Sequence, residues 1–125
     1  LALGFGEEPM EQKRLGAWMQ EHIGSPMVIL GTDRRSGFYA GSACKQFKNL
    51  QHVQLPAANA KTFEGFLSAN DVDLVVADTR YIPKFCPKFL FLLNEPVSPM
   101  LRPLVAMTEG YEKITLYEVQ RRAKK

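Results

Sequence analysis

The clearest hydrophobic pattern in the chain is a short apolar run at residues 72–78, Val-Asp-Leu-Val-Val-Ala-Asp. Five of its seven residues are apolar, three are valine, and polar residues follow it. A short apolar run rich in β-branched residues is typical of a strand that is covered on both faces. The preceding segment, Asn59 to Asn70, has Phe63, Phe66 and Leu67 at helical spacing. The pattern therefore predicts a helix that leads into an interior parallel strand.

An amphipathic helix is predicted near the start of the chain. Glu7-Glu8-Pro9 suits a first helical turn, because proline is preformed for it and carboxylates favour the positive end of the helix dipole. Spacings of three and four then predict a core-facing stripe, which consists of Leu15, Trp18, Met19 and His22. The water-facing side is predicted to consist of Glu11, Gln12, Lys13, Gln20 and Glu21. Gly24 is predicted to end the helix as a left-handed cap.

The next third of the chain contains a first strand and a short helix. Met27 to Gly31 is apolar and predicts an interior strand. Asp33 is suited to cap a short helix from Arg34 to Ala40, which Gly41 closes. The polar and basic segment Lys45 to His52 is interpreted as a loop, and His52 to Leu55 as a second strand that ends at Pro56.

The last part of the chain predicts a helix and a hairpin. Pro87 suits the first turn of a helix with a broad apolar surface, formed by Phe89, Leu90, Leu92 and Leu93. Leu101 to Met107 predicts a fourth strand, and its early proline favours an edge position. Lys113 to Val119 alternates and predicts a fifth strand, with Ile114, Leu116 and Val119 inward and with Thr115 and Glu118 in water.

This order of elements predicts an α/β fold, a three-layer sandwich with a mostly parallel sheet of about five strands and an antiparallel C-terminal hairpin. A length of 125 residues indicates one domain. We expect the domain to span residues 7–120, with a linker at 1–6 and a basic tail at 121–125. No apolar run approaches the ~20 residues that a membrane span needs, so the chain as given is expected to be soluble. It begins at Leu1 and not at a methionine, which indicates processing or a piece of a longer protein.

Charge and cysteine content exclude several classes of function. The net charge of +3 is mild, and outside the basic tail there is no basic stripe, so no nucleic-acid partner is expected. Cys44 and Cys86 are too few for a disulfide framework and lack metal-ligand spacing. They are interpreted as two buried thiols, and a bridge between them stays open for an oxidising compartment. Neither a metal nor a cofactor is predicted.

Charged residues follow two of the predicted parallel strands. In open α/β sheets, sites lie beyond the carboxyl ends of the strands, where the chain order changes direction. One interpretation is an anion-binding or acid/base crevice formed by Asp33, Arg34, Asp78, Arg80 and Tyr81. The other, which we favour, is that each aspartate caps the following helix and pairs with an arginine of the other loop.

Catalytic motifs are absent, and one aromatic segment stands out. The chain has no Gly-rich phosphate loop after the first strand, no Gly-x-Ser-x-Gly elbow and no paired histidines on a helix. No residue is therefore assigned a catalytic role. Phe85, Phe89 and Phe91 lie among lysines and are candidates for an interface with a membrane or a partner domain. The alternative is a helix that covers the sheet, which we favour because a parallel sheet needs both faces covered.

The order of these motifs resembles a known family. The motifs are Ala17-Trp18-Met19, Val28-Ile29-Leu30, Phe38-Tyr39-Ala40-Gly41, Val53-Gln54-Leu55-Pro56, residues 72–78 with Arg80-Tyr81, and residues 114–119. Together they are similar to the C-terminal extracytoplasmic domain of membrane glycosyltransferases of the dolichyl-phosphate-mannose protein mannosyltransferase and aminoarabinose transferase type. The resemblance covers roughly residues 11–119, and the segment Lys45 to His52 departs from it by being longer and more basic.

The resemblance implies that the same polypeptide contains a membrane domain. It also implies that sugar is transferred from a polyprenyl-phosphate donor to an acceptor on the periplasmic side of the membrane. The catalytic acid of such enzymes lies in the membrane part, so none is carried over to this chain. The sequence thus leaves two hypotheses. One is a non-catalytic domain of a lipid-linked-sugar glycosyltransferase, serving acceptor recognition or assembly. The other is a free-standing α/β domain that binds a small anionic ligand in the crevice of Asp33, Arg34, Asp78 and Arg80.

Overall fold

A five-stranded mixed sheet in the order β2-β1-β3-β5-β4 forms the centre of the molecule. The structure is a computed structural model, and it describes residues 10–94 and 97–120. Its elements are α1 (Met10–His22), β1 (Met27–Gly31), α2 (Arg35–Ala40), η2 (Gly41–Ala43), β2 (Cys44–Asn49), η3 (Leu50–His52), α3 (Ala60–Ala69), β3 (Leu74–Asp78), α4 (Ile82–Phe85), η4 (Pro87–Leu93), β4 (Leu101–Glu109) and β5 (Glu112–Val119). The predicted linker and basic tail lie outside the described residues.

The sheet is parallel at one side and antiparallel at the other. Strand β1 pairs in parallel with both β2 and β3, while β5 runs antiparallel to β3 and to β4. The chain first crosses from β1 to β2 through α2, and then returns past β1 to β3 through α3. The direction of travel therefore reverses between β1 and β3, which makes the carboxyl ends of these two strands the switch point of the sheet.

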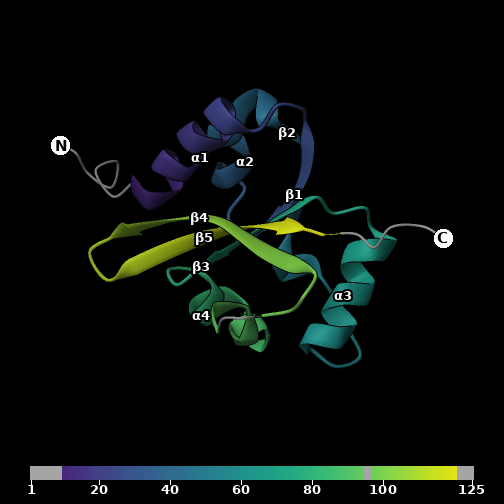
Figure 1. Ribbon diagram of the computed structural model, residues 1–125. Coiled ribbons are helices and arrows are strands. Elements are labelled where there is room, and N and C mark those ends of the chain that lie inside the picture. The colour runs from purple at the N-terminus through teal and green to yellow at the C-terminus, as the bar shows by residue number, and fades with distance from the viewer. Residues whose placement is uncertain (1–9, 95–96, 121–125) are drawn as a thin grey trace.

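Helices cover both faces of the sheet and give the predicted three layers (Figure 1). On one face, Leu15 and Met19 of α1 pack with Ala40 of α2 against side chains of the strands, which are Ile29, Leu74, Val76, Ile114 and Leu116. On the other face, α3, α4 and η4 contribute apolar side chains, which are Phe63, Leu67, Ile82, Cys86, Phe89 and Leu92. The α/β fold with an antiparallel C-terminal hairpin is confirmed.

The strongest local patterns match the observed elements. Strand β1 has the predicted bounds, and β3 is buried at all five positions. Helix α3 follows Asn59, whose side chain accepts a hydrogen bond from the Thr62 backbone while the Thr62 hydroxyl accepts one from the Asn59 backbone. This reciprocal capping box satisfies two of the amides that a helix start leaves unpaired. Most of the apolar run at residues 72–78 thus forms the interior strand β3, which follows a capped helix.

The predicted position of the second strand is wrong. Strand β2 is Cys44–Asn49 and includes most of the predicted loop Lys45 to His52, while in the predicted strand His52 to Leu55 the first residue ends η3 and the others have no regular structure. Strand β2 lies at the edge of the sheet, where it pairs only with β1. Edge strands carry lysines that discourage pairing with other chains, and Lys45 and Lys48 give β2 this composition. Because its side chains are mostly polar, its hydrophobic pattern is too weak to distinguish it from a loop.

The predicted water-facing side of α1 is also wrong at its first turn. Glu11 and Gln12 are buried, because α2 and the loop after β3 cover this part of the helix. His22, placed on the core-facing stripe, is exposed and stacks on Trp18, with ring centroids 4.3 Å apart. Gly24 is not in the left-handed region, since positive φ values among described glycines occur only at Gly41 and Gly110. The start of the helix at Glu7-Glu8-Pro9 lies outside the described residues.

Strand β5 is more deeply buried than its alternation predicts. Thr115, expected in water, is 6% exposed, and Tyr117 beside it is 2% exposed. The reason is that β5 is an interior strand between β3 and β4, and both of its faces are covered. Leu116 packs in the layer of α1, and Tyr117 packs in the layer of η4 on the other face. Strand β4 takes the edge position that Pro103 predicts, and its register shifts between Pro103 and Val105.

The two cysteines are unbridged thiols on opposite faces of the sheet. Cys86 lies in the core beneath α3 and η4, while Cys44 packs partly buried on the face covered by α1. The sheet therefore separates them, and the interpretation as two buried thiols holds for Cys86, whereas Cys44 is a free thiol that is only half-buried. In the described part of the chain, no helix is long and apolar enough to cross a membrane.

Candidate functional site

The switch point brings together the loops that follow β1 and β3. The first loop contains Thr32 and Asp33, Asp78 is the last residue of β3, and the second loop contains Arg80 and Tyr81. Parallel neighbours end at the same edge of a sheet, which is why residues almost fifty positions apart meet here. This is where an α/β protein places its ligands, so the partners of each charged group decide what the site can do.

Asp78 is a completely buried carboxylate whose oxygens are held by the protein. Its Oδ2 accepts a hydrogen bond of 2.6 Å from the Thr32 hydroxyl, and its Oδ1 accepts one of 2.5 Å from the Tyr81 backbone amide. Burial raises the pKa of Asp78, and these hydrogen bonds oppose the rise. With an exposed fraction of zero, Asp78 cannot reach a ligand in solution. It joins the ends of β1 and β3 and holds the backbone amide of Tyr81, which directly precedes α4.

Asp33 and Arg35 form an ion pair within one loop. Oδ2 of Asp33 accepts hydrogen bonds from Nε of Arg35 at 2.9 Å and from Nη2 at 2.6 Å. Nη2 of Arg35 also donates to the Tyr81 hydroxyl at 2.8 Å, which links the two loops. Asp33 raises the pKa of Arg35, so this guanidinium stays charged. Burial raises the pKa of Tyr81, so its phenol stays protonated near neutrality.

Arg80 turns away from the switch point and binds the first turn of α1. Its Nε and Nη2 donate to the two carboxylate oxygens of Glu11 at 2.6 and 3.0 Å. The Glu11 side chain is completely buried, and the Arg80 side chain is 30% exposed. Burial alone would raise the pKa of Glu11, but the hydrogen bonds and charge of Arg80 lower it overall. This bidentate pair fastens α1 to the loop after β3.

The structure brings together only part of the predicted crevice. Asp33, Asp78 and Tyr81 meet at the switch point, whereas Arg80 belongs to the contact with α1 and Arg34 is exposed beside α2. Each aspartate accepts from a nearby backbone amide, Asp33 from Arg35 and Asp78 from Tyr81, but neither is the N-cap of its helix, which is Arg34 in α2 and Tyr81 in α4. The expected pairing of each aspartate with an arginine of the other loop is wrong.

Sequence reasoning missed three residues of this network: Glu11, Thr32 and Arg35. Thr32 and Arg35 lie one and two positions from Asp33, so their proximity in the sequence is the signal that points to them. Glu11 is 69 positions from Arg80, and it was assigned to the water-facing side of its helix because it is charged. No local pattern distinguishes a carboxylate that will be buried against a distant arginine from one that stays in water.

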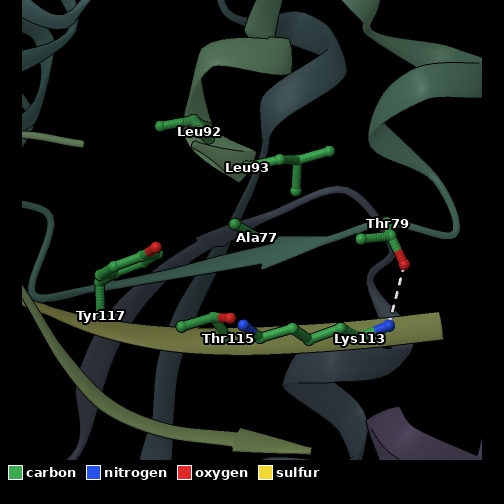
Figure 2. A pocket seen from close by; sticks show the side chains of 7 residues that line it. All are labelled: Ala77, Thr79, Leu92, Leu93, Lys113, Thr115 and Tyr117. Atoms are coloured by element: carbon green, nitrogen blue, oxygen red, sulfur yellow. Dashed lines mark hydrogen bonds between the residues drawn. The ribbon is translucent and has the colours of Figure 1, made fainter. Parts of the chain in front are cut away.

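A small cavity lies near the switch point, between β3, β5 and η4 (Figure 2). Its volume is about 30 Å³, and it is lined by Ala77, Thr79, Leu92, Leu93, Lys113, Thr115 and Tyr117. The Thr79 hydroxyl accepts from the Lys113 backbone amide at 2.9 Å and donates to Glu112 at 2.8 Å. Ligand pockets typically have ~300 Å³ or more, whereas a water needs about 10–15 Å³. This cavity therefore fits water and not a sugar or a nucleotide.

The three candidate interface phenylalanines differ in exposure. Phe89 is completely buried and packs on Phe63, while Phe91 is half-buried beside both of them. Phe85 is 48% exposed and stacks on Tyr81, with ring centroids 5.9 Å apart. The segment thus covers the sheet, as favoured, and leaves one ring at the surface.

Among the described residues, neither a metal-ligand cluster nor an activated cysteine is found at the switch point. Within the described ranges, no three His, Cys, Asp or Glu side chains are close enough to hold a metal ion. Cys86 lies near the switch point, but burial and the charge of Asp78 raise its pKa to about 11, so it is a thiol and not a nucleophilic thiolate. Comparisons with known protein families, curated proteins and solved structures find no match.

Proposed function

We propose that this chain is a non-catalytic domain of a membrane-embedded glycosyltransferase that uses a polyprenyl-phosphate-linked sugar donor. In the parent protein it serves acceptor recognition or assembly of the membrane part, on the extracytoplasmic side. The carrying observation is that each charged group named in the predicted crevice, apart from the exposed Arg34, has a partner within the protein: Asp33 has Arg35, Asp78 has the Thr32 hydroxyl, and Arg80 has Glu11. The place where an α/β enzyme holds its reacting groups is occupied here by structural contacts.

The fold supports the same proposal. The family that the sequence resembles implies an α/β domain whose chain ends in a strand such as residues 114–119. The structure has this architecture, with β5 paired to both β3 and β4. A fold alone does not define a function, so this agreement supports the proposal only together with the motif order.

The alternative, a site for a small anionic ligand, has less support from the geometry. Arg35 and Arg80 already bind carboxylates, and a ligand would have to displace Asp33 or Glu11 from them. Displacement would leave the Glu11 carboxylate buried without its partner, at a cost of several kcal/mol. Arg34 is exposed, but a single surface cation does not define a site.

The first test is the gene sequence upstream of the codon for Leu1. The proposal expects a continuous reading frame that encodes several apolar spans, with acidic residues in the first outer loop. A start codon next to Leu1, with no such spans upstream, would contradict the proposal.

The second test measures sugar transfer by the parent protein in membranes. We expect Arg35→Ala and Asp78→Asn to lower the amount of folded enzyme while leaving turnover per folded molecule unchanged, because neither side chain contacts substrate. Arg102→Ala, in an exposed pair with Glu118, is the matched control. A variant that folds like the wild type but loses turnover would assign its residue to the reaction and contradict a non-catalytic domain.

A further inference from the structure

The segment that follows β3 combines exposed apolar side chains with positive charge. Phe85 is 48% exposed and Leu90 is 44% exposed, and Lys84 and Lys88 beside them are exposed as well. We call these four residues the α4–η4 surface. Single apolar side chains at a surface are ordinary, and what distinguishes this segment is that its two exposed apolar side chains lie next to lysines in the chain.

The local structure explains why these side chains point outward. In η4 the side chains repeat every three residues, so Phe89 and Leu92 face the core while Pro87, Lys88 and Leu90 lie on other sides. In α4, Ile82 is buried and Phe85 is directed to the stack with Tyr81. The sheet is already covered by Phe89 and Leu92, so Phe85 and Leu90 are not needed for the core.

The charges of this segment have one sign. From Thr79 to Leu93 the chain contains Arg80, Lys84 and Lys88 and no aspartate or glutamate. Arg80 is bound to Glu11, which leaves the two lysines as the cations of the surface. The Lys84 ammonium lies 5.3 Å from the centre of the Phe85 ring, and that of Lys88 lies 5.6 Å from the centre of the Phe89 ring. Phe89 is buried, so only the pair of Lys84 with Phe85 presents a cation and a ring together at the surface.

We propose that the α4–η4 surface docks on a bilayer that contains anionic phospholipid, with Phe85 and Leu90 in the headgroup layer and Lys84 and Lys88 at lipid phosphates. Aromatic and aliphatic side chains bordered by lysine are the composition of interfacial membrane contacts, and each lysine near an anionic bilayer adds attraction. In the proposed parent protein, this contact sets the orientation of the domain above the membrane. The inference rests on the proposed function for the presence of a membrane, but docking itself is tested on the isolated chain.

The experiment measures partition of the 125-residue chain onto vesicles by flotation. Vesicles of phosphatidylcholine mixed with phosphatidylglycerol are compared with vesicles of phosphatidylcholine alone. We expect binding to the mixed vesicles, weakened by salt, and little binding to the neutral ones. The variant K84Q/K88Q is expected to lower the partition coefficient by about fivefold per lysine. Phe85→Ser is expected to lower it by about tenfold through lost apolar burial.

The matched control is K45Q/K61Q, which removes the same charge from exposed lysines of β2 and α3 and should leave partition within about twofold of the wild type. A second control ends the chain at Gln120, because residues 121–125 are basic and attract anionic lipid by charge alone. Circular dichroism of every variant verifies folding. Phe85→Trp adds an independent reading, since its emission should shift to shorter wavelength on mixed vesicles.

Three results would overturn the inference. One is equal loss of binding in K45Q/K61Q and K84Q/K88Q, which would indicate unspecific charge. Another is binding that disappears with residues 121–125 and is insensitive to Lys84, Lys88 and Phe85. The last is no binding to either vesicle by a folded chain. None of these would contradict the proposed function, which depends on the upstream reading frame and on the transfer assay.

Discussion

At the scale of single residues, the ion pair between Glu11 and Arg80 contains a carboxylate that is completely buried. The Glu11 side chain is completely buried, so its charge is compensated only by what the protein provides. Removing one partner of a buried pair leaves an uncompensated charge, whereas removing one partner of an exposed pair leaves a charge in water. The chain contains a buried pair, Glu11 with Arg80, and an exposed pair, Arg102 with Glu118, so the loss of an arginine can be compared between the two.

We expect Arg80→Ala to lower the free energy of unfolding by about 3 kcal/mol, because the Glu11 carboxylate stays buried without a partner. Arg102→Ala removes an arginine from a pair whose side chains are 56% and 42% exposed, and should cost less than about 1 kcal/mol. Urea unfolding monitored by circular dichroism measures both. Similar losses in the two variants would show that burial of Glu11 does not determine the effect.

The same pair predicts a dependence of stability on pH. Arg80 lowers the pKa of Glu11 in the folded protein from its ordinary value of 4.5. A carboxyl group with a depressed folded pKa stabilises the fold above its unfolded pKa, and loses this contribution as the pH falls through the folded pKa. The advantage of the wild type over Glu11→Gln in unfolding free energy should therefore be largest near neutrality and shrink below about pH 4.5. An advantage that stays constant from neutrality to acid would contradict the assignment.

At the scale of secondary-structure elements, α1 and α2 approach each other closely at Gly16. A Cβ atom added to Gly16 would lie 2.3 Å from Cβ of Tyr39 and 2.7 Å from its carbonyl oxygen. Such distances are far inside van der Waals contact, so any side chain larger than hydrogen would push the two helices apart. Gly65 on α3 provides the contrast, because a Cβ atom there would meet nothing within 4 Å.

Gly16→Ala and Gly65→Ala should therefore change stability in opposite directions. We expect Gly16→Ala to destabilise the protein by about 1–3 kcal/mol through overpacking. Gly65→Ala should stabilise it by up to about 1 kcal/mol, since alanine has the higher helix propensity. Thermal unfolding of both variants measures the difference. A stabilised Gly16→Ala variant would mean that α1 and α2 separate at little cost.

At the scale of the whole molecule, the sheet divides the interior into two apolar layers with one cysteine in each. Cys86 is 4% exposed, and burial raises its pKa to about 11. Burial also raises the pKa of the half-buried Cys44. Both thiols are therefore protonated near neutrality, and Cys86 becomes accessible only when the layer beneath α3 and η4 opens.

The rate of thiol labelling should differ between the half-buried Cys44 and the buried Cys86. At neutral pH we expect a maleimide to modify Cys44 before Cys86, and Cys86 only at a rate set by opening of the fold. Peptide mass mapping over time distinguishes the two sites, and labelling in concentrated urea provides the fully open reference. Rapid modification of Cys86 in the folded protein, at the rate measured in urea, would contradict its place in the core.

How far the sequence predicts this protein depends on the range of the interaction. Strands β1 and β3, helix α3 and the hairpin were predictable, because burial repeats along the chain with the period of each element. The meeting of Asp33 and Asp78 at one edge was predictable as well, since both follow neighbouring parallel strands. Strand β2 was not, because an edge strand is held by backbone hydrogen bonds that any side chain permits.

The sequence by itself determined the α/β class, the interior run at residues 72–78 and the absence of the catalytic motifs sought in it. Only the tertiary structure decided that Arg80 binds Glu11, that Arg35 and not Arg34 holds Asp33, and that Phe85 is exposed while Phe89 is buried. The physical reason is that apolar residues repeat with the period of the strand or helix that they belong to, and this repeat is present in a local stretch of sequence. The partner of a charged side chain depends on which distant segments pack beside it, and that information is present only in the folded chain.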